Sequence, residues 1–254
     1  MTRHFIHLAY LGANFHGWQR QPQDVSVQQA IEETLGMYFR QEIPITGAGR
    51  TDAGVNASMM IAHCDLPEPL IDDTAAVRAL NSILGRDIAI YSIAPVHPEA
   101  HARFDAVERT YRYFAHTVKD PFTGGLSWQA SPKLDFEAMN EAGKILLETS
   151  DFTSFSKLHT DVKTNICRVT EARWFPLEAP GHWCFQISAD RFLRNMVRAV
   201  VGTLVEVGRG KLTLDGFRQV IDRRDRCAAG TSMPAAPLFL HRIRYPYPVN
   251  HTAM

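Results

Sequence analysis

Short stretches of this 254-residue sequence carry side chains whose types and spacing could do chemistry. The first runs from Gly49 to Val55 and reads Gly-Arg-Thr-Asp-Ala-Gly-Val. An aspartate in a glycine-flanked loop can reach outward into a cleft, where its carboxylate can act as a nucleophile or a base. Here that residue is Asp52, and Arg50 stands close enough to influence the charge of its carboxylate. The alternative is a turn that only connects a helix to a strand.

The second stretch, from Arg109 to Tyr113, is rich in tyrosine and arginine and is typical of a β-strand. Because side chains of a strand point alternately to its two faces, Tyr111 and Tyr113 share one face and Arg112 takes the other. Aromatic rings can stack on nucleobases and arginine can bind phosphate, so this strand could contact RNA. The alternative is a strand of half-buried aromatic residues without a ligand.

The third stretch, from Arg191 to Arg198, places arginines three and four positions apart beside an apolar stripe. In a helix, Arg191, Arg194 and Arg198 would form one ridge along the edge of that stripe. Such a ridge can aim a guanidinium group into a cleft, where arginine pairs well with a carboxylate or a phosphate. The alternative is the solvated edge of an ordinary helix.

The composition is that of an ordinary globular protein, with 45% apolar residues, 21% charged residues and a net charge of zero. A nucleic-acid-binding protein without net charge must concentrate its positive charge locally. The segment from Arg191 to Arg226 does so, because its nine Arg and Lys residues minus its four Asp and Glu residues leave a charge of about +5. The charge of the segment alone favours the alternative, a solvated helical face, and Arg191, Arg194 and Arg209 are its candidates for binding RNA.

Patterns of several other functional classes do not occur in the sequence. There is no P-loop, no G-x-G-x-x-G dinucleotide loop and no G-x-S-x-G nucleophile turn. The four cysteines lack zinc-ligand spacing and are expected to be free thiols of a reducing compartment. The histidines form no recognisable metal set, and no apolar run is long enough for a membrane span or a signal-peptide core. We therefore expect a cytoplasmic protein with no metal and no membrane segment.

Hydrophobic periodicity predicts the elements that must position the three stretches. Strands are predicted around residues 6–10, 59–64, 88–93, 110–118, 167–175, 183–188 and 238–243. Helices are predicted over residues 27–38, 77–84, 135–148, 193–204 and 217–221, and a loop over residues 47–57. Ser26 with Gln29 matches a capping box at the start of the first helix.

The irregular alternation of these elements, with several hairpin-like neighbours, favours an α+β fold with mainly antiparallel sheet. The two halves have similar element content, which indicates two related subdomains flanked by helices. A break with two prolines and no clear period spans Pro95 to Arg103. It divides the chain into residues 1–103, which hold the Asp52 loop, and residues 104–254, which hold the tyrosine strand and the arginine-rich helix.

Together the three stretches resemble the tRNA pseudouridine synthase A (TruA) family over nearly the whole chain and in the family's order. Residues 49–57 resemble its G-R-T-D-A-G-V-H-A signature, residues 104–113 its F-x-A-x-x-R-x-Y-R-Y strand, and residues 192–202 its F-L-x-x-M-V-R-x-x-V-G helix. The segments 151–155 and 238–246 also fit. Two places depart from the family: Asn56 stands where histidine is common, and residues 233–237 lack the expected glycine-containing pattern.

The resemblance implies an isomerase that converts uridine to pseudouridine at positions 38, 39 and 40 of the tRNA anticodon stem-loop, with no cofactor and no metal. It implies the pseudouridine synthase fold, with two α+β subdomains around a basic central cleft, and a homodimer whose subunits share one tRNA. It implies that Asp52 is the essential catalytic residue, that Arg198 pairs with it, and that Tyr111 stacks on the flipped base and helps to remove the C5 proton. Arg50 is a candidate for holding the extruded nucleotide. The residues leave open whether Asp52 attacks the sugar or removes its 2′ proton.

Other functions are compatible with parts of this pattern. A pseudouridine synthase acting on another RNA would keep the chemistry and change only the substrate. A non-catalytic RNA-binding module would use the same basic surface, leave Asp52 dispensable and return its RNA unchanged. A small-molecule hydrolase would need a histidine beside Asp52, and no motif places one there.

Overall fold

The computed structural model describes residues 1–67, 70, 73–157 and 164–249. The chain folds into two compact units, the first formed by Met1–Val107 with Leu240–Met254 and the second by Glu108–Phe239. Each unit combines antiparallel strands with flanking helices, so the chain is α+β, which confirms the predicted fold class. In this grouping the end of the last strand returns to the first unit, whereas the division predicted after residue 103 kept that strand in the second subdomain.

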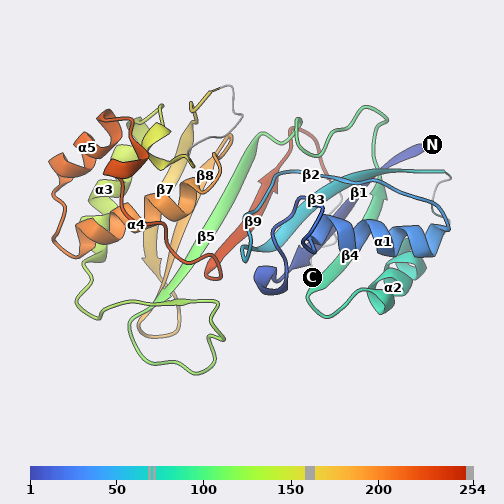
Figure 1. Cartoon of the computed structure of the whole chain (residues 1–254), viewed down its shortest axis with the longest axis horizontal. Helices are drawn as coiled ribbons and strands as arrows, with labels where there is room; N and C mark the ends of the chain where they lie inside the picture. The colour runs from blue at the N-terminus through green and yellow to red at the C-terminus, as the bar shows by residue number, and fades with distance from the viewer. Residues whose placement is uncertain (68–69, 71–72, 158–163, 250–254) are drawn as a thin grey trace. The chain divides into compact units, whose positions relative to one another are not determined.

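The sheet of the first unit is built around the N-terminal strand (Figure 1). Its strands are β1 (Thr2–Tyr10), β2 (Thr46–Gly47), β3 (Asn56–Leu66), β4 (Ile88–Pro95) and, from Leu240 onward, β9 (Leu238–Arg244). They are ordered β4-β1-β3-β9, and β2 pairs with β3. Ile6 lies opposite Ala62 and Leu8 lies opposite Met60 in the antiparallel ladder of β1 and β3. All four side chains are buried, so the alternation predicted for β1 is confirmed.

Helices α1 (Val27–Phe39) and α2 (Asp73–Ile83) flank this sheet. α1 begins where the side chain of Ser26 accepts a hydrogen bond of 3.2 Å from the backbone N–H of Gln29. The side chain of Gln29 donates to Glu33 at 2.9 Å, so only half of the predicted capping box forms. Tyr38, the last apolar position of the predicted helical period, is 38% exposed, so the buried stripe of α1 ends before it.

The second unit pairs its strands mainly antiparallel to one another. Its strands are β5 (Glu108–His116), β6 (Trp128–Gln129), β7 (Val169–Pro176) and β8 (His182–Ala189). The order is β5-β8-β7, and the short strand β6 pairs in parallel with β5. Tyr111 lies opposite Ile187 and Tyr113 opposite Phe185 in the ladder of β5 and β8, so both tyrosines are on the same face of the sheet.

Helices α3 (Phe136–Glu148), α4 (Met196–Gly208) and α5 (Leu214–Asp222) flank the strands of the second unit. α3 packs closely on β7, because a Cβ atom at Gly143 would lie 2.7 Å from the carbonyl oxygen of Ala172. Almost every residue of α4 is buried, from Met196 to Gly208. α4 is therefore a core helix, and a side chain at its N-terminal end has a well-fixed backbone beneath it.

The prediction that Arg191, Arg194 and Arg198 form one helical ridge is wrong. Asn195 has a left-handed backbone with φ of 65°, and α4 begins only at the next residue. Of the three arginines, Arg198 alone lies in the helix. Leu193 is buried although it precedes the helix. Its apolar side chain fits the helical spacing of the buried residues of α4, and for this reason the helix was predicted to begin too early. The loop predicted over residues 47–57 is shorter in the structure, because β2 ends at residue 47 and β3 begins at residue 56.

Within the described ranges, no group of three or more His, Cys, Asp or Glu side chains is placed to hold a metal ion. No helix in that part of the chain is both long enough and apolar enough to cross a membrane. All four cysteines are free thiols, as predicted, and Cys227 is the exposed one among them.

Candidate active site

Asp52 lies in the loop that connects β2 to β3 in the first unit. The backbone N–H of Val55 donates to the carbonyl oxygen of Asp52 at 3.1 Å, and Gly54 has a φ of 76°, so the chain turns sharply just after the aspartate. Asp52 is half-buried, whereas Arg50 is exposed. The loop thus presents a carboxylate and a guanidinium from neighbouring positions, as expected of a substrate-binding loop.

The loop is held in place by the segment that precedes α1. The hydroxyl groups of Tyr10 and Thr51 share a buried hydrogen bond of 2.9 Å. The backbone N–H of Trp18 donates to the carbonyl oxygen of Thr51 at 3.2 Å, and the N–H of Gly54 donates to that of Phe15 at 3.3 Å. The backbone is therefore fixed on both sides of Asp52, which restricts where its carboxylate can point.

The close approach of these two segments depends on glycines. Gly17 has a φ of +89°, and a Cβ atom there would lie 2.5 Å from the carbonyl oxygen of Thr51. A Cβ atom at Gly12 would collide with the carbonyl oxygen of Val55. Sequence reasoning missed this support, although the run Gly-Ala-Asn-Phe-His-Gly-Trp from Gly12 to Trp18 carries both glycines and a bulky aromatic residue.

Asn56, the departure from the family signature, has a structural role. It is 1% exposed, and its side-chain oxygen accepts a hydrogen bond of 2.8 Å from the backbone N–H of Gly12. A buried backbone donor needs such a partner. The residue that follows the Asp52 loop therefore ties the loop's end to the segment before α1.

Tyr111, in the second unit, is half-buried on β5 and packs against the ring of Phe192. The two ring centroids are 5.0 Å apart with an interplanar angle of 81°, an edge-to-face arrangement. Tyr113, two residues on, is fully buried on the same face. Arg112 points to the other face and donates to the side-chain oxygen of Gln186 at 2.8 Å, which confirms the predicted alternation. Phe192 was not predicted to support Tyr111.

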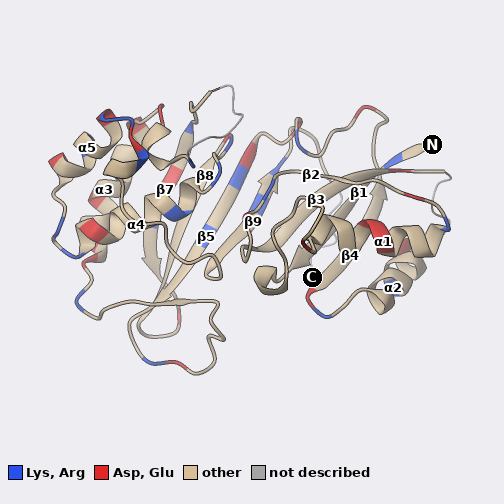
Figure 2. Ribbon diagram, in the orientation of Figure 1, with Lys and Arg blue, Asp and Glu red and all other residues tan. Residues whose placement is uncertain are grey.

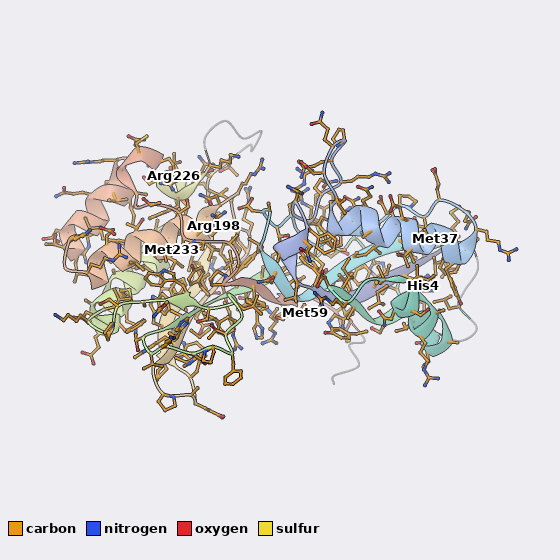
Figure 3. The ribbon with its side chains drawn as sticks, turned by 60° about the horizontal axis from the view of Figure 1, so that its bottom comes forward. His4, Met37, Met59, Arg198, Arg226 and Met233 are labelled. Atoms are coloured by element: carbon orange, nitrogen blue, oxygen red, sulfur yellow. The ribbon has the colours of Figure 1, made fainter. Side chains whose placement is uncertain are left out.

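Arg198 lies in the first turn of α4, where its neighbours fix it (Figure 3). Its Nε donates to the carbonyl oxygen of Met233 at 2.6 Å, and the backbone N–H of Met233 donates to the carbonyl oxygen of Arg198 at 3.1 Å. A Cβ atom at Gly202 would collide with the carbonyl oxygen of Thr231, so this segment lies directly on the helix. The segment that departs from the family pattern is thus the one that orients Arg198.

The predicted RNA-binding arginines have different surroundings. Arg194 is exposed and Arg191 is half-buried, and both precede α4. Arg209 follows the helix, and its guanidinium forms an ion pair of 2.9 Å with Glu206, whose carboxylate also lies 3.7 Å from Lys211. Arg209 therefore has a local countercharge that offsets part of its positive charge.

The site residues are distributed over the two units: Asp52 and Arg50 belong to the first, and Tyr111, Arg198 and the remaining arginines belong to the second. The first unit offers a carboxylate in the Asp52 loop. The second unit offers an arginine at the start of α4 and an aromatic ring on β5. Each of these groups can act on a nucleotide.

Comparisons with known proteins identify the family of this chain. The profile of the family described as tRNA pseudouridine synthase matches residues 6–105 and 142–246, so that β5 with Tyr111 lies between the matched ranges. The tRNA pseudouridine synthase A of Parabacteroides distasonis is 58% identical over 246 residues, which cover 97% of each chain. The enzyme of the same name from Porphyromonas gingivalis is 56% identical over 97% of this chain and 98% of its own. The chain therefore belongs to the tRNA pseudouridine synthase family.

Proposed function

We propose that this protein is an isomerase that converts uridine to pseudouridine in tRNA, with Asp52 as its essential catalytic residue. Family membership supports the reaction and the substrate. The observation that carries the role of Asp52 is the fixation of its loop, through the hydrogen bonds of Thr51, Gly54 and Asn56 to the segment before α1. A catalytic carboxylate must be held in a defined position before the substrate arrives.

The reaction needs no group from outside, because pseudouridine is an isomer of uridine. The bond between the sugar C1′ and the base N1 breaks, the base turns, and a bond forms between C1′ and C5. C5 loses its proton and N1 gains one, so nothing is oxidised and no group is carried away. Asp52 can start this sequence either by attacking the sugar or by removing the 2′ proton.

The second unit supplies the groups proposed to assist Asp52. Arg198 pairs with the Asp52 carboxylate and keeps it ionised and oriented. Because the Nε of Arg198 is taken up by Met233, the terminal nitrogens of the guanidinium are the ones assigned to the carboxylate. Tyr111 stacks on the flipped base and assists the loss of the C5 proton, and its edge-to-face contact with Phe192 keeps the ring in place.

The positions of the target uridines and the residues that bind the tRNA are part of the same proposal, and they follow from the family resemblance. The target uridines are those at positions 38, 39 and 40 of the anticodon stem-loop, and Arg50 holds the extruded nucleotide. Arg191, Arg194 and Arg209 bind the tRNA backbone in a basic cleft. The protein acts as a homodimer in the cytoplasm, its two subunits sharing one tRNA, and the reaction uses neither a metal nor a cofactor.

Tritium release from unmodified tRNA labelled at uridine C5 tests the proposal directly. The wild-type protein is expected to release tritium, and Asp52→Asn is expected to release none while binding tRNA with nearly unchanged affinity. Asp215→Asn, an exposed carboxylate on α5, is the matched control and should keep full activity.

The outcomes separate the competing functions. Tight binding of tRNA without tritium release by the wild-type protein would identify a non-catalytic RNA-binding module. Release from another labelled RNA and not from tRNA would keep the chemistry and change the substrate. Substantial release by Asp52→Asn would remove Asp52 from the catalytic role.

A further inference from the structure

The first unit carries a second basic feature that the proposed reaction does not use. It is a groove of about 390 Å³, formed where the last strand leaves the sheet. The residues that define it here come from β1, β3 and the C-terminal segment: His7, Met59, Arg242, Arg244, Tyr245 and Tyr247. No Asp or Glu is among the described residues that line this groove. It thus offers positive charge and aromatic surface to a ligand.

Arg242 is an exposed cation of this groove. Its side chain makes no hydrogen bond and no ion pair with the part of the chain that the structure describes. Arg244, two residues along β9, is also exposed and shares the face of Arg242, while Ile243 between them is buried. Figure 2 shows the resulting band of basic residues on β9.

The aromatic side of the groove is rigid. The rings of Tyr245 and Tyr247 stack with centroids 5.9 Å apart and an interplanar angle of 28°. The hydroxyl of Tyr245 donates to the carbonyl oxygen of Ala102 at 2.6 Å, and that of Tyr247 donates to Asp105 at 2.6 Å. Rings that are fixed in this way lose little conformational entropy when a planar group stacks on them.

Asp105 is the carboxylate that touches this aromatic pair. One of its oxygens accepts hydrogen bonds from the hydroxyl of Tyr247, at 2.6 Å, and from the backbone N–H of His101, at 2.8 Å. These two donors hold the pKa of Asp105 below its usual value, so the carboxylate is ionised at neutral pH. It is engaged by those donors and does not appear among the groups that line the groove with Arg242.

We propose that this groove is an additional binding site for the tRNA backbone, in which Arg242 takes a phosphate and Tyr247 offers its ring to an adjacent base. The proposal rests on the proposed function, because that function supplies the polyanion. The run Arg-Ile-Arg-Tyr-Pro-Tyr from Arg242 to Tyr247 places two arginines directly before two tyrosines, and proteins use this combination of side chains to hold phosphate and unstacked bases. A protein partner would instead need an acidic group placed against Arg242, whereas RNA presents phosphates along its whole length.

Charge variants of Arg242 test the groove. Binding of unmodified tRNA is measured by fluorescence anisotropy between about 50 and 300 mM salt for the wild-type protein, Arg242→Gln, Arg242→Lys and Arg242→Glu. Loss of one phosphate contact is expected to weaken binding about fivefold to tenfold at about 0.1 M salt and to lower the salt slope by about one. Arg242→Lys should keep most of the affinity. Arg78→Glu, an exposed arginine on α2, makes the same change of net charge outside the groove and should bind like the wild type.

The variants should fold normally, because Arg242 makes no bond in the described structure that a substitution would remove, and thermal unfolding checks this. Equal affinity and equal salt slope for Arg242→Glu and Arg78→Glu would overturn the proposal that the groove binds the tRNA backbone. Tritium release by the wild-type protein would in that case leave the proposed function intact. A change of molecular mass in sedimentation caused by Arg242→Glu alone would overturn the proposal in a different way, because it would assign the groove to a second copy of the chain.

Discussion

The backbone N–H of Gly12 donates a hydrogen bond of 2.8 Å to the side-chain oxygen of Asn56, and both residues are buried. Gly12 precedes α1, and Asn56 is the first residue of β3, directly after the loop that holds Asp52. This hydrogen bond therefore joins two segments that are 44 residues apart in the sequence and fixes one end of the loop.

Asn56→Ala is expected to destabilise the protein by about 1–3 kcal/mol, because it leaves a buried backbone donor without a partner. It should also lower kcat more than it raises KM, since the loop that carries Asp52 loses one of its anchors. Urea unfolding and steady-state tritium release measure the two effects. Gln23→Ala, which changes an exposed amide in the segment before α1, is the control and should change neither quantity. An Asn56→Ala protein as stable as the control would contradict the anchoring role.

Gly17→Ala tests the close approach on the other side of Asp52. A methyl group at this position would meet the carbonyl oxygen of Thr51 at 2.5 Å, and the φ of +89° strains any L-residue. We expect a loss of about 1–3 kcal/mol in stability and a drop of at least about tenfold in kcat. Gly49→Ala provides a matched comparison within the signature, because a Cβ atom there meets nothing within 4 Å. Equal activity of the two variants would show that this approach does not position Asp52.

Features that depend on neighbouring residues could be predicted from the sequence, whereas features that depend on residues distant in the sequence could not. The strand of Ile6 and Leu8 and the alternation of Tyr111 and Arg112 could be predicted, because period and burial are properties of neighbouring residues. The start of α4 could not, because the buried Leu193 imitates helical spacing ahead of the true helix. The Gly12–Trp18 support was missed for a related reason. Its hydrogen bonds connect residues that are distant in the sequence, and no local pattern reports them.

Arg198→Lys tests whether a guanidinium is required at the start of α4. Lysine keeps the charge but has no Nε–H to donate to Met233 and cannot make a forked pair with a carboxylate. We expect kcat to fall by about 10–100-fold, which corresponds to the loss of one charge-assisted hydrogen bond. Steady-state tritium release with the variant measures the effect.

Arg226→Lys is the control for that experiment. Arg226 also binds the segment that covers α4, through the carbonyl oxygen of Gly230 at 3.1 Å and the hydroxyl of Ser232 at 2.7 Å. Both substitutions loosen this segment, but only Arg198 is assigned to Asp52. If the two variants lose the same activity, Arg198 acts through the segment alone.

His63 should make the stability of the first unit depend on pH. The pKa of His63 is lowered to about 4, chiefly by burial and also by the charges of Arg3 and His101, against the opposing effects of Asp65 and Asp105. The unfolded chain binds a proton at His63 below about pH 6.5, whereas the folded protein binds it only near pH 4. Stability is therefore complete above about pH 6.5 and is lost as the pH falls towards 4, by about 1–3 kcal/mol.

His63→Asn removes the titrating ring but keeps an acceptor for the backbone N–H of Ala102, which bonds to Nδ1 of His63 at 3.1 Å. Urea unfolding between about pH 4.5 and 7 should thus show a flatter pH dependence for this variant than for the wild type. His16→Asn, which changes an exposed histidine of the same unit, should keep the wild-type slope. His101, whose pKa is also lowered by burial, contributes to the remaining slope with the same sign. If His63→Asn and His16→Asn show identical slopes, the buried imidazole is not the group that destabilises the fold in acid.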